Sequence, residues 1–492
     1  MSRPRTARLA ATIAGPLLLG GCVATASTDL YGPGDAGFSQ VLGQVTPATG
    51  TARPAWVQNA EQARMVSDRV SKLVQGKTIS AETAVQVALI NNRGLQAAYS
   101  DLGISAADAW QQTLLPNPTV SVGLLGIGQP GLVAFRTIEG FVASNILALA
   151  THPKRSAIAE TRFRQAQMQA AGETLRIAAE TRQAWIEAVA AFEAVASLNQ
   201  ARQAADAASE LAEKLGQSGA MPKAAQAREH AFYAELTGQI AEARLAAKLA
   251  KEKLSRSMGL WGPDMKFFVP DALPALPVRL MKKEHVEREA LQRRTDLLMA
   301  RIELEATARE LGLTKATRYV TDLGLVAGVE TERELEDGQI QTKGTAQLEL
   351  DVAIPIFDSG AARMKKAEFT YMRAANRLAE RAINIRSEAR SAYLAYRASH
   401  EIARHYRNSV VPLRTRVEEE SLLTYNGMIT NTFELLADTR ARIGTVLLAA
   451  RAKRDFWLAE AGLAAAIHGG GAPSSIEGGG GATTVADASG GH

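Results

Sequence analysis

The chain has 492 residues, of which 5% are aromatic and 22% charged, and its formal net charge is +5. This length has room for two or three domains, but the shortage of aromatic residues argues against a set of compact globules with bulky cores. The first 21 residues hold three arginines and no acidic residue, so their removal lowers the net charge from +5 to +2. This balanced charge argues against a nucleic-acid partner, which needs a clustered basic face.

Residues 1–21 have the pattern of a signal peptide. Three arginines precede the apolar stretch LAATIAGPLLLGGC, which is shorter than the roughly 20 residues that span a bilayer. The stretch ends in LGGC, which resembles the bacterial lipobox, and Cys22 is the only cysteine of the chain. We therefore expect Cys22 to be the lipid attachment site of an acylated N-terminal segment, residues 22–77. A chance cysteine near an ordinary cleavage site is the alternative.

The rest of the chain contains one pattern twice. Arg155 and Arg363 lie 208 positions apart, and so do Gly219 and Gly427. Alanine-rich helices resemble one another by composition, but a constant spacing of other residue types indicates a duplicated supersecondary unit. The two copies are expected at 78–260 and 284–467, joined by a proline-rich connector at 261–283 and followed by a disordered glycine-rich tail at 468–492.

Both copies predict the same elements in the same order. A helix of middling length is expected at 80–115 and again at 284–317. Two strands follow in each copy, at 118–127 and 136–149, then at 319–330 and 344–357. Stretches almost free of glycine and proline, from Pro153 to Leu215 and from Ala361 to Leu423, predict helices of about 60 residues, roughly 90 Å long. After a break, a helix of about 35–40 residues returns and completes a long hairpin.

The segment TAQLELDVAIPI is the clearest strand. Its apolar residues from Ala346 to Ile354 alternate with polar ones, and Val120, Val122 and Leu124 share a face in the same way. We expect ETERELEDGQ to form an acidic surface loop between the two strands of the second copy. Four strands with one apolar face are too few to close a barrel, whereas three chains would supply 12. A soluble, half-buried strand is the alternative for this alternation.

These features together resemble the TolC-type outer-membrane efflux proteins. The resemblance covers about residues 78–467 and rests on the helix TISAETAVQVALINNRGLQAA, the strand-to-helix junction PIFDSGAARMKKAE and the turn YNGMITNTFELL. It implies a mainly α fold with a small β part, in which a homotrimer forms a 12-stranded β-barrel continued by an α-helical barrel. It also implies a lipid-anchored outer-membrane channel that extends into the periplasm and meets a periplasmic adaptor and an inner-membrane pump. Such channels serve tripartite efflux or type I secretion systems.

The turns between paired helices are the sites that the resemblance singles out. They form the periplasmic entrance and the adaptor contact, and here they contain Gly219, Met221, Gly427 and Met428. Both glycines are expected to provide the backbone freedom that a turn needs, although simple helix termination explains them nearly as well.

The entrance itself departs from the family pattern. Members often carry aspartates just beyond the second glycine, but this chain has Phe433 and Leu436 there. Phe433 and Glu434 are therefore the candidates for an entrance constriction, and a solvated carboxylate is the plainer role for Glu434.

We expect no enzyme, no cofactor and no metal site, because the seven histidines are scattered and no thiolate cluster or phosphate-binding loop is present. The main alternative function is a periplasmic coiled-coil lipoprotein that acts as a scaffold or adaptor without a pore. That alternative leaves the duplicated alternating strands unexplained. The sequence does not identify the exported substrate, which drugs, metal ions and proteins all fit.

Overall fold

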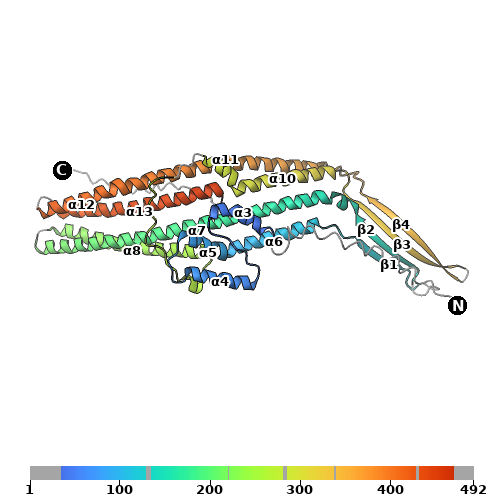
Figure 1. Ribbon diagram of the computed structural model, residues 1–492, viewed down its shortest axis with the longest axis horizontal. Coiled ribbons are helices and arrows are strands. Elements are labelled where there is room, and N and C mark those ends of the chain that lie inside the picture. Colours follow the sequence, from blue (N-terminus) through green and yellow to red (C-terminus); the bar gives the residue numbers. More distant parts are fainter. Residues whose placement is uncertain are drawn as a thin grey trace. The chain divides into compact units, whose positions relative to one another are not determined.

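The computed structural model describes residues 35–128, 135–219, 221–280, 285–336, 339–427 and 432–469. The predicted signal peptide, Cys22 and residues 470–492 lie outside these ranges. The chain divides into two compact units. The first contains residues 1–66, 90–174 and 293–384, and the second contains residues 67–89, 175–292 and 385–492. Figure 1 labels the helices and strands.

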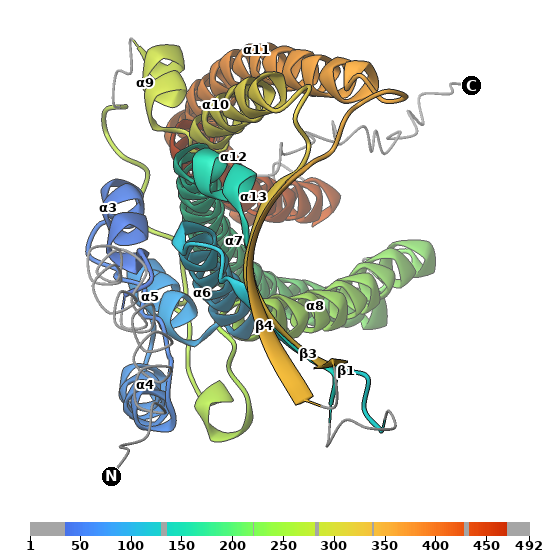
Figure 2. The same ribbon diagram turned by 90° about the vertical axis from the view of Figure 1, so that its right-hand side faces the viewer.

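Four strands in the first unit form one antiparallel sheet. They are β1 (Thr119–Leu125), β2 (Thr137–Asn145), β3 (Leu323–Glu336) and β4 (Gln339–Val352), in the order β1-β2-β3-β4. Figure 2 shows them curving together. Each copy of the duplication thus contributes an antiparallel pair, and β2 of the first copy pairs with β3 of the second. The mainly helical fold with a small antiparallel sheet is as predicted.

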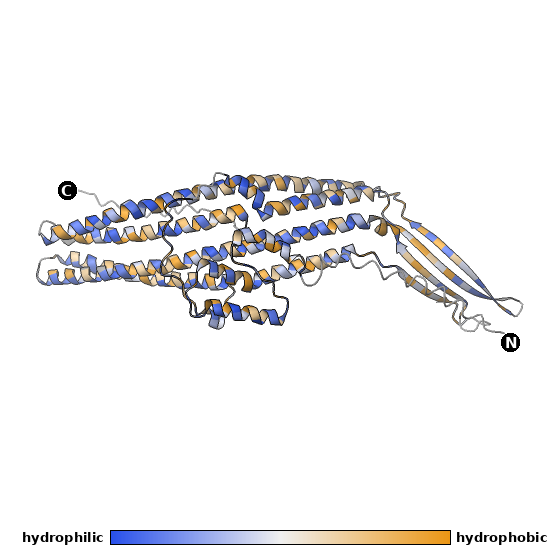
Figure 3. Cartoon of the chain, viewed as in Figure 1, coloured by the Kyte–Doolittle hydropathy of each residue, from blue (hydrophilic) through white to orange (hydrophobic). Residues whose placement is uncertain are grey.

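One face of this sheet is apolar and exposed. Val120 lies opposite Val142, Val142 opposite Ala327, and Ala327 opposite Leu348. The side chains of Val120 and Leu348 are 68% and 76% exposed. The apolar stripes predicted for the first and second copies therefore lie on the same face, and the alternating colours along the strands in Figure 3 follow this pattern.

The opposite face is polar and predominantly acidic. Glu139 lies opposite Glu330, and the amide of Gln347 donates to Glu330 at 3.0 Å. Gly328 is required on this face, because a Cβ there would lie 2.2 Å from Cδ1 of Phe141. The sheet therefore has one side suited to hydrocarbon and one suited to water.

The predicted acidic loop ETERELEDGQ is wrong. Residues 330–336 are the end of β3, and β4 begins at Gln339. Glu330, Glu332 and Glu334 lie on the polar face, where Arg136 pairs with Glu332 at 2.9 Å and Lys343 with Glu334 at 3.3 Å. These cross-strand pairs allow a strongly charged segment to remain a strand.

Each helix of middling length is interrupted once, which the sequence did not predict. The first consists of α5 (Ala81–Asn91) and α6 (Arg93–Thr113), and the second of α9 (Val286–Arg293) and α10 (Thr295–Ala316). The interrupting residues Asn92 and Arg294 are 202 positions apart and have nearly the same φ and ψ, −64° and 119° against −66° and 121°. The Asn92 side chain caps α6 by accepting from the Leu95 N–H at 3.0 Å.

The long helix of the first copy starts earlier than predicted. Helix α7 (Ile146–Gln217) has 72 residues, so Pro153 lies inside it rather than at its start. Asn145, the last residue of β2, accepts a hydrogen bond from the Ala148 N–H at 2.7 Å and satisfies an otherwise unpaired donor of the first turn. Pro153 is the eighth residue of α7, so its missing N–H removes one hydrogen bond of the helix ladder, and the helix continues through it.

The long helix of the second copy changes its winding once. Helix α11 (Ala361–His405) passes through a π-helical turn, η4 (Tyr406–Val410), into α12 (Val411–Asn426). Pro412 lies two residues after this turn, and the wider turn accommodates a residue that cannot donate to the helix ladder. Gly360, just before α11, has φ +71°, and a Cβ there would lie 2.6 Å from the carbonyl oxygen of Arg318.

Shorter elements complete the two units. The returning helices are α8 (Lys223–Ser257) and α13 (Thr432–His468), close to the predicted lengths. Helices α3 (Phe38–Thr49) and α4 (Ala60–Val74) occupy the N-terminal segment, for which no structure was predicted. The proline-rich connector includes a short 3₁₀ turn, η3 (Gly262–Met265), and the Asp264 carboxylate accepts from Ser71 at 2.8 Å. No helix within the described residues is long and apolar enough to cross a membrane.

Buried hydrogen bonds tie the short elements to the long helices. In the second unit, the indole N–H of Trp185 on α7 donates to the Ile79 carbonyl at 3.0 Å. In the first unit, the Tyr99 hydroxyl of α6 lies 2.9 Å from Oγ1 of Thr174 on α7. Because Thr174 donates its own hydrogen to the Ala170 carbonyl, Tyr99 is the donor in this pair. Burial raises the pKa of the Tyr99 hydroxyl well above its ordinary value.

Replacing Tyr99 with phenylalanine is expected to lower the free energy of unfolding by about 1 kcal/mol near neutral pH, because the Thr174 oxygen loses its donor. The raised pKa predicts a second effect. Above about pH 10 the unfolded chain releases the Tyr99 proton while the folded chain keeps it, so this contribution to stability falls by up to about 1.4 kcal/mol per pH unit.

Denaturation of wild type and Tyr99→Phe in detergent, measured from pH 7 to pH 11, tests both effects. The wild-type protein should lose its advantage above pH 10, so that the two curves converge. A constant difference across this range would contradict the raised pKa.

Candidate functional site

The first helical hairpin of the second unit turns at a left-handed glycine. Helix α7 ends at Gln217 and α8 begins at Lys223, and Gly219 between them has φ +77°. Its N–H donates to the Gly216 carbonyl at 3.1 Å. A Cβ at Gly219 would meet no atom within 4 Å, so the backbone conformation rather than space favours glycine here. The expected backbone freedom is thus used at this turn.

Met221 lies in the same turn, but its side chain points inward. It is only 6% exposed and packs with Ala212, Ala225 and Leu215. Its N–H donates to the Leu215 carbonyl at 3.2 Å. Met221 therefore stabilises the turn through apolar packing, and its side chain exposes little surface that an adaptor could contact.

The second hairpin does not use its glycine in the same way. Gly427 follows α12 with φ −79° and ψ 3°. Other residues adopt this conformation readily, so the backbone at this position does not require the freedom of a glycine, contrary to expectation. Its N–H donates to the Leu423 carbonyl at 3.0 Å, as in simple helix termination. Met428 lies outside the described residues.

The predicted constriction residues lie in the first turn of α13. Helix α13 begins at Thr432, so Phe433 belongs to its backbone, although the Phe433 side chain is outside what the structure describes. Glu434 is exposed, and a carboxylate in the first turn of a helix interacts favourably with the helix dipole. This geometry does not assign either residue to a constriction. The entrance constriction at Phe433 and Glu434 therefore stays a prediction.

An ion pair between the two hairpins was missed by the sequence analysis. Nη2 of Arg440 on α13 lies 2.8 Å from Oε1 of Glu229 on α8, and the guanidinium covers the Phe232 ring at 4.4 Å from its centroid. The Glu229 side chain is 6% exposed and the Arg440 side chain 34%. A carboxylate buried to this extent needs a partner, so this pair fastens the second hairpin to the first.

A signal for this pair exists in the sequence. Ala225, Leu236 and Ile240 form the buried stripe of α8, and Glu229 occupies a position of the same stripe. A glutamate in an apolar stripe is rarely buried without a partner. The position of Glu229 could therefore have indicated a buried ion pair, but only the structure identifies Arg440 as its partner.

Further contacts hold each hairpin together near its end. In the second hairpin, Arg442 pairs with Glu418, and the Ser421 hydroxyl donates to Asp438. In the first, the hydroxyl of Ser209 lies 2.7 Å from Nδ1 of His230. An apolar cluster joins α7, α8 and α13 farther along, and its buried members are Leu198, Ala201, Ala205, Leu236, Ile240 and Ile443.

The exposed surface of the first hairpin carries an ordinary helical ion pair. Lys214 lies 2.7 Å from Glu210, one turn earlier on α7. The hydrogen bond from Lys214 lowers the pKa of the Glu210 carboxyl. Within the described residues, no group of three or more histidine, cysteine, aspartate or glutamate side chains is arranged to hold a metal ion.

Solved structures of outer-membrane channels share this architecture. The outer-membrane channel OprN aligns with a TM-score of 0.68 and 16% identity over 86% of this chain and 95% of its own. CmeC from Campylobacter jejuni aligns with a TM-score of 0.64 and 16% identity over 80% and 86% of the two chains. VceC from Vibrio cholerae aligns with a TM-score of 0.65 and 16% identity over 79% and 96%. At such identity the likeness establishes the fold.

The match to a sequence family covers less of the chain than the structural alignments do. Residues 286–439, within the second copy, match the family described as outer membrane efflux protein. No curated protein matches the chain at a significant level. The resemblance predicted from the sequence is thus confirmed: residues 286–439 match the outer membrane efflux protein family, and the chain has the fold of TolC-type outer-membrane channels.

Proposed function

We propose that this chain is the outer-membrane channel of a tripartite efflux or type I secretion system. Three copies close a 12-stranded barrel in the outer membrane, and their long helices continue it as a tunnel into the periplasm. Acyl chains on Cys22 anchor each copy to the same membrane. Substrate enters from an inner-membrane pump, and a periplasmic adaptor contacts the ends of the helical hairpins.

The two-sided sheet carries this proposal. Its apolar face is exposed in the single chain, its acidic face is suited to a water-filled lumen, and β1 and β4 are edge strands. Lipid-exposed sheet edges are not viable, because unpaired backbone groups in hydrocarbon cost several kcal/mol each. Closure of the barrel by further copies supplies the missing partners and places each face in the environment that suits it.

The ends of the hairpins are the proposed entrance. Gly219 and Gly427 lie at the turns, Met428 is the next residue in the sequence after Gly427, and Phe433 and Glu434 on α13 form the constriction. The ion pair between Arg440 and Glu229 keeps the two hairpins of one chain together at this end. We expect this pair to oppose any outward movement of the second hairpin that widens the entrance.

The first test is electrophysiological. The purified protein should run as a heat-sensitive, SDS-resistant trimer and give stable open steps in a planar bilayer. The double variant Phe433→Ala, Glu434→Ala should change the conductance, because it removes an apolar and an acidic side chain from the constriction. Wild type and variant should be compared at the same salt concentration, with the heated monomer as the negative control.

A trimer that passes no ions even after both hairpin turns are truncated would contradict the channel. That result would favour the scaffold, because truncation removes any closed entrance. Unchanged conductance in the double variant, alongside clear wild-type conductance, would contradict only the position of the constriction.

The second test concerns the ion pair between the hairpins. Glu229→Gln leaves the Arg440 guanidinium without its carboxylate, and we expect a loss of about 2 kcal/mol in the stability of this contact. The open probability of the channel should rise, because the second hairpin separates more readily. Glu210→Gln is the matched control, since it also neutralises a glutamate paired with a cation, but on the exposed face of α7. Equal open probabilities in the two variants would show that the buried pair does not restrain the entrance.

The third test concerns the lipid anchor. Because Cys22 is the only cysteine, radiolabelled palmitate incorporated into the protein should disappear completely in Cys22→Ala. Uncleaved precursor should accumulate at the same time. Incorporation of label into Cys22→Ala would overturn Cys22 as the attachment site.

A further inference from the structure

Two equivalent grooves lie beside the strand-to-helix junctions of the first unit. The first lies among α6, α7 and α10 and has a volume of about 430 Å³, and its polar lining residues are Ser105, Asp108, Gln112, Arg155, Arg162 and Glu310. The second lies between α10 and α11, has a volume of about 290 Å³ and is lined by Thr307, Glu310, Thr314, Arg363 and Lys366.

The duplication relates these grooves position by position. Asp108 corresponds to Glu310 at the spacing of 202, and Arg155 corresponds to Arg363 at the spacing of 208. Ser105 and Thr307 are equivalent hydroxyls. The second basic residue changes position, from Arg162 in the first groove to Lys366 in the second. Each groove nevertheless keeps two basic side chains, at least one acidic side chain and at least one hydroxyl. Backbone duplication alone preserves the shape of a groove but not this combination of groups.

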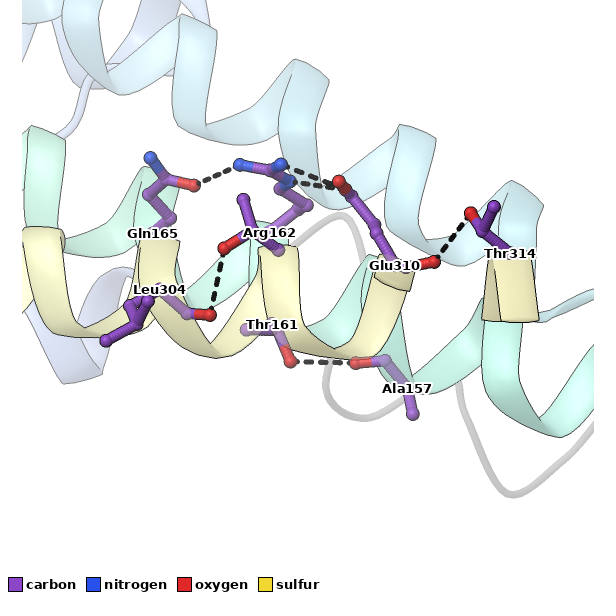
Figure 4. A network of polar contacts seen from close by, with 8 residues as sticks. Ala157, Thr161, Arg162, Gln165, Leu304, Glu310 and Thr314 are labelled. Carbon is purple, nitrogen blue, oxygen red and sulfur yellow. Dashed lines mark hydrogen bonds and ion pairs between the residues drawn. The ribbon is translucent and has the colours of Figure 1, made fainter. Parts of the chain in front are cut away.

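One wall is shared. Nη2 and Nε of Arg162 on α7 lie 2.9 and 3.3 Å from Oε1 of Glu310 on α10, and the backbone carbonyl of Glu310 accepts from Thr314 (Figure 4). Glu310 lines both grooves, so they adjoin at this residue of α10. The Arg162–Glu310 pair forms a fixed ridge between them.

Other charged groups in the grooves are available to a ligand. Within the described residues, the side chains of Asp108, Arg155 and Lys366 make no hydrogen bond or ion pair. Arg363 lies 3.7 Å from Asp358 and donates to the Arg318 carbonyl at 3.4 Å, and both contacts are long and exposed. Side chains of opposite charge that line the same groove suit a zwitterionic group better than a simple anion.

The position of the grooves indicates where such a group comes from. Arg363 is the third residue of α11, and Phe357, six residues earlier, is fully exposed together with Ile354 and Ile356. These apolar residues continue the apolar surface of β4 to the junction, so the basic side chains begin where that surface ends. An apolar surface that is followed by basic side chains is the pattern expected at a membrane interface.

The N-terminal segment lies on the same side. Phe163, which lines the first groove, is so close to Gly37 that a Cβ there would lie 2.8 Å from its Cζ atom. Asp35, the first described residue, follows the proposed acylation site by 13 positions. Thirteen residues reach at most about 45 Å, so the anchored segment ties this face of the first unit to the membrane surface.

The geometry points to these two grooves as binding sites for the headgroups of zwitterionic phospholipids of the phosphatidylethanolamine type. Arg155 and Arg363 bind the lipid phosphate. Asp108 accepts hydrogen bonds from the primary ammonium group in the first groove, and Glu310 accepts them in the second through Oε2, because Arg162 occupies only its Oε1. The acyl chains lie against the apolar surface of the sheet. This inference rests on the proposed outer-membrane location.

The test is lipid binding to the full-length protein, purified in detergent, freed of lipid and followed by native mass spectrometry. Wild type should bind dioleoyl-phosphatidylethanolamine more tightly than dioleoyl-phosphatidylcholine, because a trimethylated ammonium has no hydrogen to donate. The double variant Arg155→Gln, Arg363→Gln should bind phosphatidylethanolamine roughly ten-fold more weakly, the effect of losing one charge-assisted hydrogen bond per groove. Asp108→Asn with Glu310→Gln should abolish the preference for phosphatidylethanolamine.

The matched control is Lys154→Gln with Lys365→Gln. These exposed lysines lie next to the groove residues on α7 and α11 but line neither groove, so the control removes the same charge in the same helical turns. Equal losses in the groove and control variants would overturn the inference, and so would equal binding of the two lipids by wild type. Displacement of bound lipid by millimolar inorganic phosphate would also overturn it, because the grooves would then be simple anion sites.

The same preparations separate this inference from the proposed function. Each spectrum reports the oligomeric state, and each preparation is also examined in a planar bilayer. A conducting trimer whose groove variant retains lipid contradicts only the headgroup sites, whereas a monomer without conductance contradicts the channel itself.

Discussion

Backbone pairing at the edges of the small sheet is the constraint on which the proposed assembly depends. β1 and β4 each pair on one side only, so each presents an outward row of N–H and C=O groups. In water these groups bind solvent, but beside hydrocarbon they must bind another strand. Because the exposed face of the sheet is apolar, the single chain leaves those side chains without packing partners. It also leaves the backbone groups of both edge strands without a neighbouring strand. The long helices that follow β2 and β4 also need packing partners, because a hairpin of this length has more surface than one chain can cover.

The duplication has kept backbone geometry more faithfully than side-chain chemistry. Asn92 and Arg294 interrupt equivalent helices with nearly equal φ and ψ, yet Asn92 caps its helix whereas the buried Arg294 is held by Asp296 at 2.8 Å. Two unrelated side chains therefore support the same break.

The elements that could be predicted are those with a regular pattern of residue types along the sequence. Alternation in TAQLELDVAIPI identified β4, and the shortage of glycine and proline identified the long helices. A one-residue break such as Asn92 leaves the apolar period intact, so it was missed. The segment ETERELEDGQ was misassigned because a strand with a charged face has the composition of a loop. Pairings between distant positions, such as Glu229 with Arg440, require the fold, although the burial of Glu229 had a signal in its position on α8.

The two ends of the helical hairpins have diverged to different degrees, and the proposed assembly accounts for the difference. At the junction with the strands, both copies keep an arginine and a carboxylate in equivalent grooves. At the turns of the hairpins, Gly219 is left-handed whereas Gly427 is not, and Met221 is buried in the first turn. A lipid surface presents the same chemistry to both copies, so it selects for equivalent side chains. An adaptor protein contacts the two hairpins at different places on its own surface, and the constraint that keeps the two turns alike is then absent.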